Sequence, residues 1–186
     1  MATTQTIRLW QPQQLNNSGI RRLKLIDADT VKLLPVGIQT NQVSLLPQGD
    51  VVLYEFIFPS DLSCVANTAL QKTNTGDYYW VQNLGFSLPH IQDEVLLWMQ
   101  SNVFNKWLAI TEAYNGSIRL FGGTPYGLDL SMQATTGATP KDSNPMSFSL
   151  SGEQLYPYHR IPGYEDESIF PTNAGFTHGF SLAFES

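Results

Sequence analysis

Alternation of apolar and polar residues runs through most of the chain and predicts a mainly β fold. The clearest case is a β-hairpin, in which 107–114 has the two alternating rows of a half-buried strand and 117–121 is the return strand. Asn115-Gly116 lies between the two strands, and this dipeptide is typical of a two-residue type I′ turn, in which both residues have positive φ. We therefore expect the other strands to be arranged around this hairpin.

Further segments with strand-like composition predict an antiparallel sheet. The segment 51–58, VVLYEFIF, is β-branched or aromatic at most positions, so we expect a central strand that is covered on both faces. The segment 59–77 mixes turn residues with a milder apolar stretch and predicts a protruding loop. The remaining predicted strands are 20–26, 30–34, 43–46, 77–88, 126–135 and 146–151.

One segment, 90–104, has the apolar periodicity of an α-helix. Trp98 lies within its apolar face, so we expect this side chain to be buried where the helix meets the sheet. The predicted fold class is therefore a β-sandwich or a barrel-like arrangement of antiparallel sheets with one flanking helix. The apolar face consists of Ile91, Val95, Trp98 and Met99.

The two ends of the chain do not follow this pattern and are interpreted as arms around a β-sandwich domain of residues 20–152. Residues 1–19 are polar apart from a few side chains such as Trp10, which needs a surface to cover it. Residues 153–186 contain three prolines and seven aromatic residues. That content is too aromatic for a disordered tail, so we expect this arm to pack on the domain or on a neighbouring subunit.

Composition and charge narrow the function classes. The chain has 186 residues, with 10 Lys and Arg against 16 Asp and Glu, and only 14% of its residues are charged. The net charge of −6 argues against DNA binding through a basic patch. It is compatible with a surface past which DNA moves, because an acidic wall repels phosphate.

The search for catalytic and metal-binding motifs predicts no enzyme, no cofactor and no metal. The three histidines are not at the spacing of metal ligands, and neither a nucleophile elbow nor a phosphate-binding loop is present. Cys64 is the only cysteine, so no internal disulfide forms, and we interpret it as a core residue. The acidic run at 165–167 is interpreted as a solvated turn rather than a calcium site.

No signal peptide and no membrane-spanning stretch are expected. The first residues lack a basic segment followed by an apolar one. No apolar run reaches the length of about 18 residues that a spanning helix requires. We therefore expect a protein that is made in a cytoplasm and has no membrane partner.

Four segments taken together resemble tail tube and tail-terminator proteins of tailed phages, especially those of Bacteroidetes hosts. They are the opening strand and acidic turn at 19–31, the strand and helix at 78–104, the Asn-Gly hairpin ending at 123, and the closing strands at 128–152. The resemblance implies a β-sandwich with one helix that assembles into rings, commonly hexameric, stacked around a DNA conduit.

The resemblance also implies partners, a location and candidate residues. We expect a structural protein of the virion tail that contacts itself and other tail or head–tail connector proteins, while DNA passes without specific binding. The loop 59–77 and both arms would make contacts between rings, and two acidic strand residues would line the lumen. The expected assembly residues are Trp10, Leu62, Val65, Leu70, Tyr156, Tyr158, Phe176 and Phe180, and the possible lumen residues are Glu55 and Glu112.

Three other functions remain open at this point. The chain could be a carbohydrate-binding β-sandwich of a fibre or glycan-binding module, in which case exposed aromatic residues should cluster on one concave face. It could form a ring at the head–tail connector instead of the tail tube. An enzyme of an unrecognised type is the third alternative, although no motif supports it.

Overall fold

The computed structural model describes residues 19–36, 41–59, 64–135 and 145–170, and the fold is mainly β. An eight-stranded antiparallel sheet has the strand order β4-β1-β7-β9-β10-β6-β5, with β8 paired to β7, and β2 and β3 form a second sheet. The elements are β1 Ile20–Asp27, η1 Ala28–Thr30, β2 Val31–Pro35, β3 Val43–Pro47, β4 Leu53–Ile57, β5 Cys64–Lys72, β6 Tyr78–Leu88, α1 Asp93–Asn102, β7 Lys106–Ala113, β8 Ile118–Phe121, β9 Leu128–Ala134, β10 Met146–Gln154 and α2 Asp166–Ile169.

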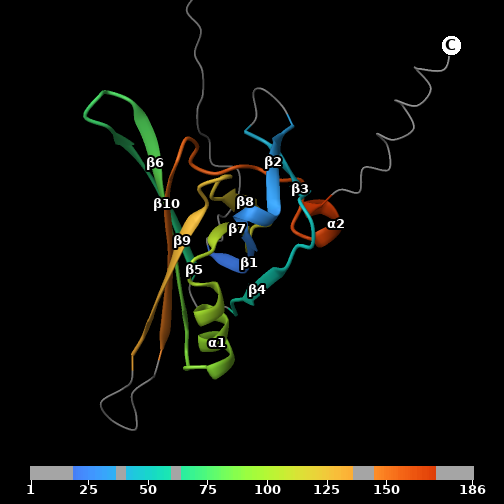
Figure 1. Cartoon of the computed structure of the whole chain (residues 1–186), viewed down its shortest axis with the longest axis vertical. Coiled ribbons are helices and arrows are strands. Elements are labelled where there is room, and N and C mark those ends of the chain that lie inside the picture. The colour runs from blue at the N-terminus through green and yellow to red at the C-terminus, as the bar shows by residue number, and fades with distance from the viewer. Residues whose placement is uncertain (1–18, 37–40, 60–63, 136–144, 171–186) are drawn as a thin grey trace, which may run out of the picture.

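The large sheet curls back on itself (Figure 1). β7 and β9 are joined by only two residue pairs, so the sheet divides there into two halves. Phe56 of β4 lies 5.0 Å from Phe86 of β6 and 6.3 Å from Phe148 of β10, measured between ring centroids. The two halves therefore face each other across a shared core, and the predicted antiparallel β fold with one flanking helix is confirmed.

Helix α1 closes this first core at one end. Its Trp98 is partly buried and lies 5.2 Å from the ring of Tyr54 and 5.5 Å from that of Trp107. Trp107 is completely buried, and Met99 is the buried residue of the helix itself. Trp98 therefore packs where the helix meets the sheet, but it is partly buried rather than buried as expected.

A second core covers the opposite face of β1 and β7. Successive side chains of a strand point to opposite faces, so Ile26 and Ile110 lie in this core while their neighbours Leu25 and Ala109 lie in the first. The β2–β3 hairpin and the segment 155–170 supply the cover. From that segment, Ile161, Tyr164 and Ile169 are buried in the second core.

Two predicted segments have a different place in the fold. β4, within 51–58, is an edge strand rather than a central one, and its Ile57 is 65% exposed. The segment 59–77 is not mainly a loop, because β5 occupies 64–72 and pairs with β6 along its whole length. Within 64–72, the apolar residues thus belong to a hairpin, in which cross-strand pairs stabilise both strands.

The β7–β8 hairpin is confirmed, but its turn is of another type. The Gly116 N–H donates to the Ala113 carbonyl, and the Ala113 N–H donates to the Ser117 carbonyl, both at 2.9 Å. Gly116 has φ of 76°, whereas Asn115 is not among the described residues with positive φ. This is a three-residue loop, a type I turn followed by a left-handed glycine, rather than the two-residue I′ turn.

Candidate functional site

The solvent side of the four-stranded layer β5–β6–β10–β9 forms a continuous exposed surface, which we call the polar face. β10 shows how it arises, because Met146, Phe148 and Leu150 are buried while the serines between them are exposed. The strand registers bring residues of all four strands into one surface. The polar face consists of Val65, Asn67, Ala69, Gln71, Tyr79, Val81, Asn83, Gly85, Ser87, Asp129, Ser131, Gln133, Ser147, Ser149, Ser151 and Glu153.

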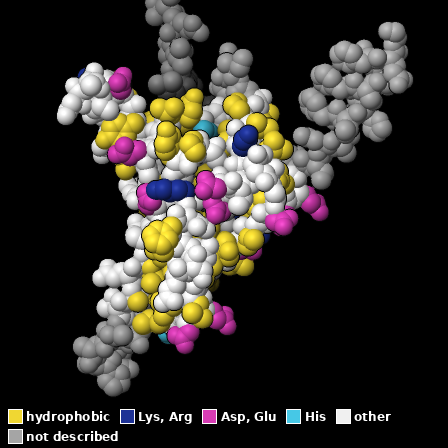
Figure 2. Space-filling view, viewed as in Figure 1, with side chains coloured by type: hydrophobic (Ala, Val, Ile, Leu, Met, Phe, Trp, Pro, Cys, Tyr) yellow, Lys and Arg dark blue, Asp and Glu magenta, His cyan; other side chains and the backbone are white. Residues whose placement is uncertain are grey.

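The polar face has small side chains and no cation of its own. Its only ionisable groups apart from Tyr79 are the carboxylates of Asp129 and Glu153, and Asp129 forms an ion pair with Lys106 at the start of β7. Figure 2 likewise shows more acidic than basic side chains on the side in view. The cation beside this surface, Lys106, lies opposite Asp129 in the ladder and is paired with its carboxylate, and the four strands themselves add no Lys or Arg that would hold a phosphate backbone.

The β5–β6 hairpin projects beyond the rest of the layer, at the upper left of Figure 1. β10 pairs with β6 only as far as Trp80, whereas β5 continues to pair with β6 up to Tyr78. Below the tip lies an open groove in which two tyrosines and an apolar residue accompany polar and charged groups. Its lining residues are Lys72, Thr73, Asn74, Asp77, Tyr78, Tyr79, Glu153 and Leu155.

The expected assembly residues lie in different places. Val65 and Leu70 are half exposed on β5 but point to opposite sides of it, with Val65 on the polar face. Tyr156 is 51% exposed, while Tyr158 packs against Phe121 in the first core. Trp10, Leu62, Phe176 and Phe180 lie outside the described residues.

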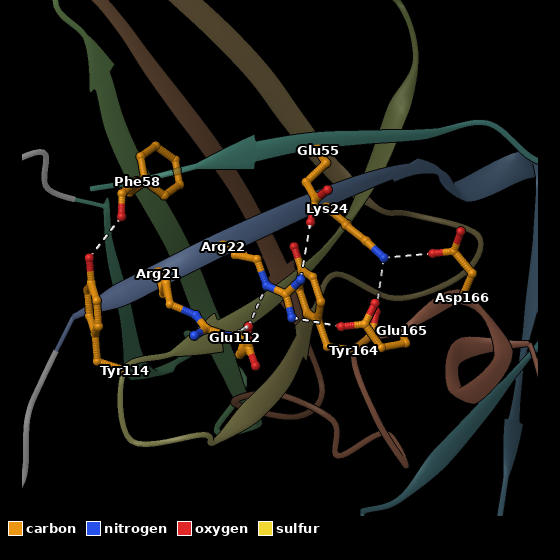
Figure 3. A network of polar contacts seen from close by, with 10 residues as sticks. All are labelled: Arg21, Arg22, Lys24, Glu55, Phe58, Glu112, Tyr114, Tyr164, Glu165 and Asp166. Carbon is orange, nitrogen blue, oxygen red and sulfur yellow. Dashed lines mark hydrogen bonds and ion pairs between the residues drawn. The ribbon is translucent and has the colours of Figure 1, made fainter. Parts of the chain in front are cut away.

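The two acidic residues expected in a lumen belong to an ion-pair network beside β1 (Figure 3). The Glu112 carboxylate accepts hydrogen bonds from Arg22 at 2.6 Å and from Arg21 at 2.8 Å. Arg22 also donates to Glu165 at 2.9 Å, and the Glu55 carboxylate lies 3.9 Å from its guanidinium. Glu55 and Glu112 do point away from the first core, but the guanidinium group of Arg22 lies beside both carboxylates.

The electrostatics of Glu112 follow from this position. Desolvation is the largest single influence and raises its pKa, but the hydrogen bonds and charges of Arg22 and Arg21 outweigh it, so that the pKa is lowered. The same interactions raise the pKa of Arg22, those with Glu112 most strongly. Glu112 is therefore ionised at neutral pH and its charge is compensated within the subunit.

A buried lysine ties the segment 155–170 to β1. Lys24 is 5% exposed, and its ammonium group donates to Asp166 at 2.6 Å and to the Tyr164 carbonyl at 3.1 Å. The ammonium also lies 4.6 Å from the centre of the Tyr164 ring, within the range of a cation–π contact. Burial, followed by the negative charge of Glu55, raises the pKa of Tyr164, so its hydroxyl stays neutral.

His159 makes the same segment sensitive to acid. Its ring is buried against Tyr156, with centroids 5.3 Å apart, and its backbone pairs with that of Leu120. Burial lowers the pKa of His159, so the unfolded chain binds the proton more readily than the folded one. The contribution of His159 to the free energy of unfolding is therefore fully present above pH 6.5, the ordinary pKa of a histidine. It is lost as the pH falls below that value.

We expect His159→Phe to flatten the dependence of the unfolding free energy on pH between 8 and about 5. The control is His90→Gln, which removes an exposed histidine from the same chain. Urea denaturation at a series of pH values measures the effect. Equal slopes for wild type and His159→Phe would contradict it.

The described residues offer no reactive thiol, no metal site and no helix that could cross a membrane. Burial raises the pKa of the Cys64 thiol to about 12, which keeps it protonated and unreactive. In the described part of the chain, no three His, Cys, Asp or Glu side chains lie close enough together to hold a metal ion. No helix among these residues is long and apolar enough to cross a membrane.

Sequence reasoning missed the polar face as a surface. The signal was present in the alternating serines of 147–151, but that alternation alone does not tell which strands lie beside it. Comparisons of the chain with protein-family models, with curated proteins and with solved structures found no match.

Proposed function

We propose that this chain is a structural subunit that assembles into rings, as the tail tube of a tailed phage does, with the polar face towards a conduit for DNA. The observation that carries the proposal is the polar face itself, an exposed four-stranded surface without Lys or Arg. Its middle rows, around Gly85 and Ser149, carry small side chains, and one of its two carboxylates is already paired with Lys106. Glu55 and Glu112 are not part of the proposed lumen.

The wall of a DNA conduit should hold DNA only weakly. Each cation that contacts a phosphate releases counterions and strengthens binding, so a basic wall would retain the DNA that it must let pass. An uncharged or weakly acidic wall avoids that retention. The projecting β5–β6 hairpin supports the same proposal, because its tip, which carries the exposed Tyr78, extends beyond the last row that β10 pairs and could contact a further ring.

Assembly of the full chain is the first test. Negative-stain microscopy and sedimentation of the purified protein over a range of concentrations should show rings that stack into tubes. Single rings that never stack would favour the head–tail connector alternative within the same proposal. A monomer at every concentration and salt condition would contradict the proposal.

The orientation of the polar face is the second test. Ser149→Lys adds one cation per subunit at an exposed position of that face, and the matched control Gln100→Lys adds one on the exposed side of α1. Preassembled Ser149→Lys rings should bind linear duplex DNA at low salt but not closed circular DNA, which cannot thread a ring. Equal binding of both DNA forms would place the face outside the ring and contradict the conduit.

A carbohydrate-binding function is the second candidate, favoured by the groove below the β5–β6 tip. Tyr78, Tyr79, Asp77 and Glu153 are among its lining residues, and aromatic residues beside acidic ones are a combination that suits a sugar. Binding of the wild type on a glycan array, lost in Tyr78→Ala, would support this function. The variant should fold normally, because Tyr78 is 60% exposed.

A further inference from the structure

The outer edge of β4 has no partner strand among the described residues. β4 stands at the end of the strand order and pairs with β1 alone. Such an edge presents unpaired backbone N–H and C=O groups, and natural edges are commonly protected by lysine, by proline or by a covering segment. Residues 53–57 contain neither lysine nor proline, and the carboxylate of their one charged residue, Glu55, lies 3.9 Å from the guanidinium of Arg22. A covering segment is the protection that this edge can still receive.

The apolar surface beside this edge is incompletely covered. Tyr54 and Phe56 of β4 face the first core but are only partly buried, whereas Phe86 and Trp107 face the same core from inner strands and are buried. On the other face of β4, Ile57 is 65% exposed. Because side chains of neighbouring strands pack side by side on one face, a further strand beside β4 would cover the exposed parts of both aromatic residues.

The described part of the chain ends close to the start of β4. Phe170, its last residue, packs against the second core, as Leu53 of β4 does. Asp166 of α2 is bound to Lys24, whose ladder partner on the other side lies on β4. Figure 1 likewise shows α2 near the beginning of β4. The point from which residues 171–186 continue is therefore close to the open edge.

The sequence that follows Phe170 contains a stretch that fits this edge. Residues 180–184, FSLAF, alternate between large apolar and small side chains, which is typical of a strand with one covered face. β4 itself has five residues and is roughly 17 Å long. Residues 171–179 can extend over roughly 30 Å, so 180–184 can reach the edge in either direction.

We propose that residues 180–184 dock on the open edge of β4 of the same subunit as an additional strand. Their three large apolar side chains then lie on the face that carries Tyr54 and Phe56, and the two small ones lie on the other face, beside Ile57. Backbone hydrogen bonds to the edge hold the added strand, and burial of its apolar side chains decides which face they take. The inference concerns the single subunit and goes beyond the proposed assembly.

Hydrogen exchange of β4 in the full chain is the first test, at a protein concentration at which sedimentation shows a monomer. Replacing Leu182 and Phe184 together with glutamine should raise the exchange rate of the β4 amides at least about tenfold, because the added strand no longer buries apolar surface. The matched control replaces Ser181 and Ala183 together with glutamine, on the other face of the same stretch. This control should exchange as the wild type does, and equal rates in all three proteins would contradict the docking.

Disulfide trapping identifies what occupies the edge. In a Cys64→Ala background, Ile57→Cys is combined in turn with Ser181→Cys, Ala183→Cys or Glu185→Cys, because opposed residues of a strand pair are close enough for a disulfide. One combination should form the bond within a single chain. The oxidised protein then has no free thiol and still runs as a monomer on a non-reducing gel.

A control and the alternative outcomes make the result specific. Gln133→Cys, exposed on the polar face on the far side of the layer from the first core, replaces Ile57→Cys in the control and should keep its thiol free with the same three partners. Covalent dimers in place of the bond within one chain would show that a second copy occupies the edge, and this would overturn the proposal. Absence of a bond in every combination would overturn it as well. Since all readouts come from the single subunit, failure of the docking leaves ring assembly standing, and failure of ring assembly leaves the docking standing.

Discussion

Replacing Trp107 with alanine is expected to lower the free energy of unfolding by about 3–5 kcal/mol, as for other buried large aromatic residues. The indole is completely buried, and the rings of Tyr54 and Trp98 lie 5.7 Å and 5.5 Å from it. It therefore joins β4, β7 and α1, and its removal leaves a cavity that these elements share. Because domains have only about 5–15 kcal/mol of stability in total, much of the variant should be insoluble.

Urea denaturation followed by circular dichroism measures this effect, with two comparison variants. Trp98→Ala should cost less than Trp107→Ala, since Trp98 is partly exposed on α1. Leu97→Ala removes a side chain that is 63% exposed on the same helix and should stay within about 0.5 kcal/mol of the wild type. Melting of Trp107→Ala at the wild-type midpoint would show that the core does not depend on this contact.

Local patterns were sufficient for the elements whose partners are close in sequence. The helix predicted over 90–104 is α1, Asp93–Asn102, and the hairpin around Asn115-Gly116 is β7 and β8. The turn type was wrong because Asn-Gly suits both a I′ turn and a longer loop in which only the glycine has positive φ. The choice depends on the register of the two strands, which the dipeptide does not contain.

Strand position within the sheet could not be read from composition. The segment 51–58 has the residues of a central strand, yet β4 lies at an edge and uses Tyr54 and Phe56 to cover the core. β5 has the weak strand sequence CVANTALQK and forms because β6 pairs with it over nine residues. Whether a strand lies at the edge or in the centre of a sheet depends on which distant segments pair with it. β propensity depends on the same context.

The ion-pair network beside β1 could not be predicted from the sequence either. The alternation in 107–114 correctly directed Glu112 away from the first core, but its partner Arg22 is 90 residues away, and Arg22 binds Glu165 over a separation of 143 residues. No local spacing signals such contacts. The acidic run at 165–167, interpreted as a solvated turn, supplies partners for Arg22 and Lys24.

The two partners of the Lys24–Asp166 pair are expected to differ sharply in what their loss costs. Asp166→Ala leaves the ammonium of Lys24, which is 5% exposed, with the Tyr164 carbonyl and ring as its remaining partners. Loss of one partner costs 3–5 kcal/mol in a fully buried pair, and we expect about 2–3 kcal/mol here because the Asp166 side chain is 67% exposed. Lys24→Met removes the charge itself and fills similar volume, so its cost should be below about 1 kcal/mol.

The double variant Lys24→Met with Asp166→Ala should then be about as stable as Lys24→Met alone, since no uncompensated charge is left. A double-mutant cycle from urea denaturation at pH 7 gives the coupling between the two residues. Trypsin cleavage after Arg160 gives a local measurement, because the segment 155–170 should open more often in Asp166→Ala than in Lys24→Met. If Asp166→Ala costs no more than Lys24→Met, the ammonium is not held in the second core by this carboxylate, and Ile161, Tyr164 and Ile169 alone attach the segment to β1.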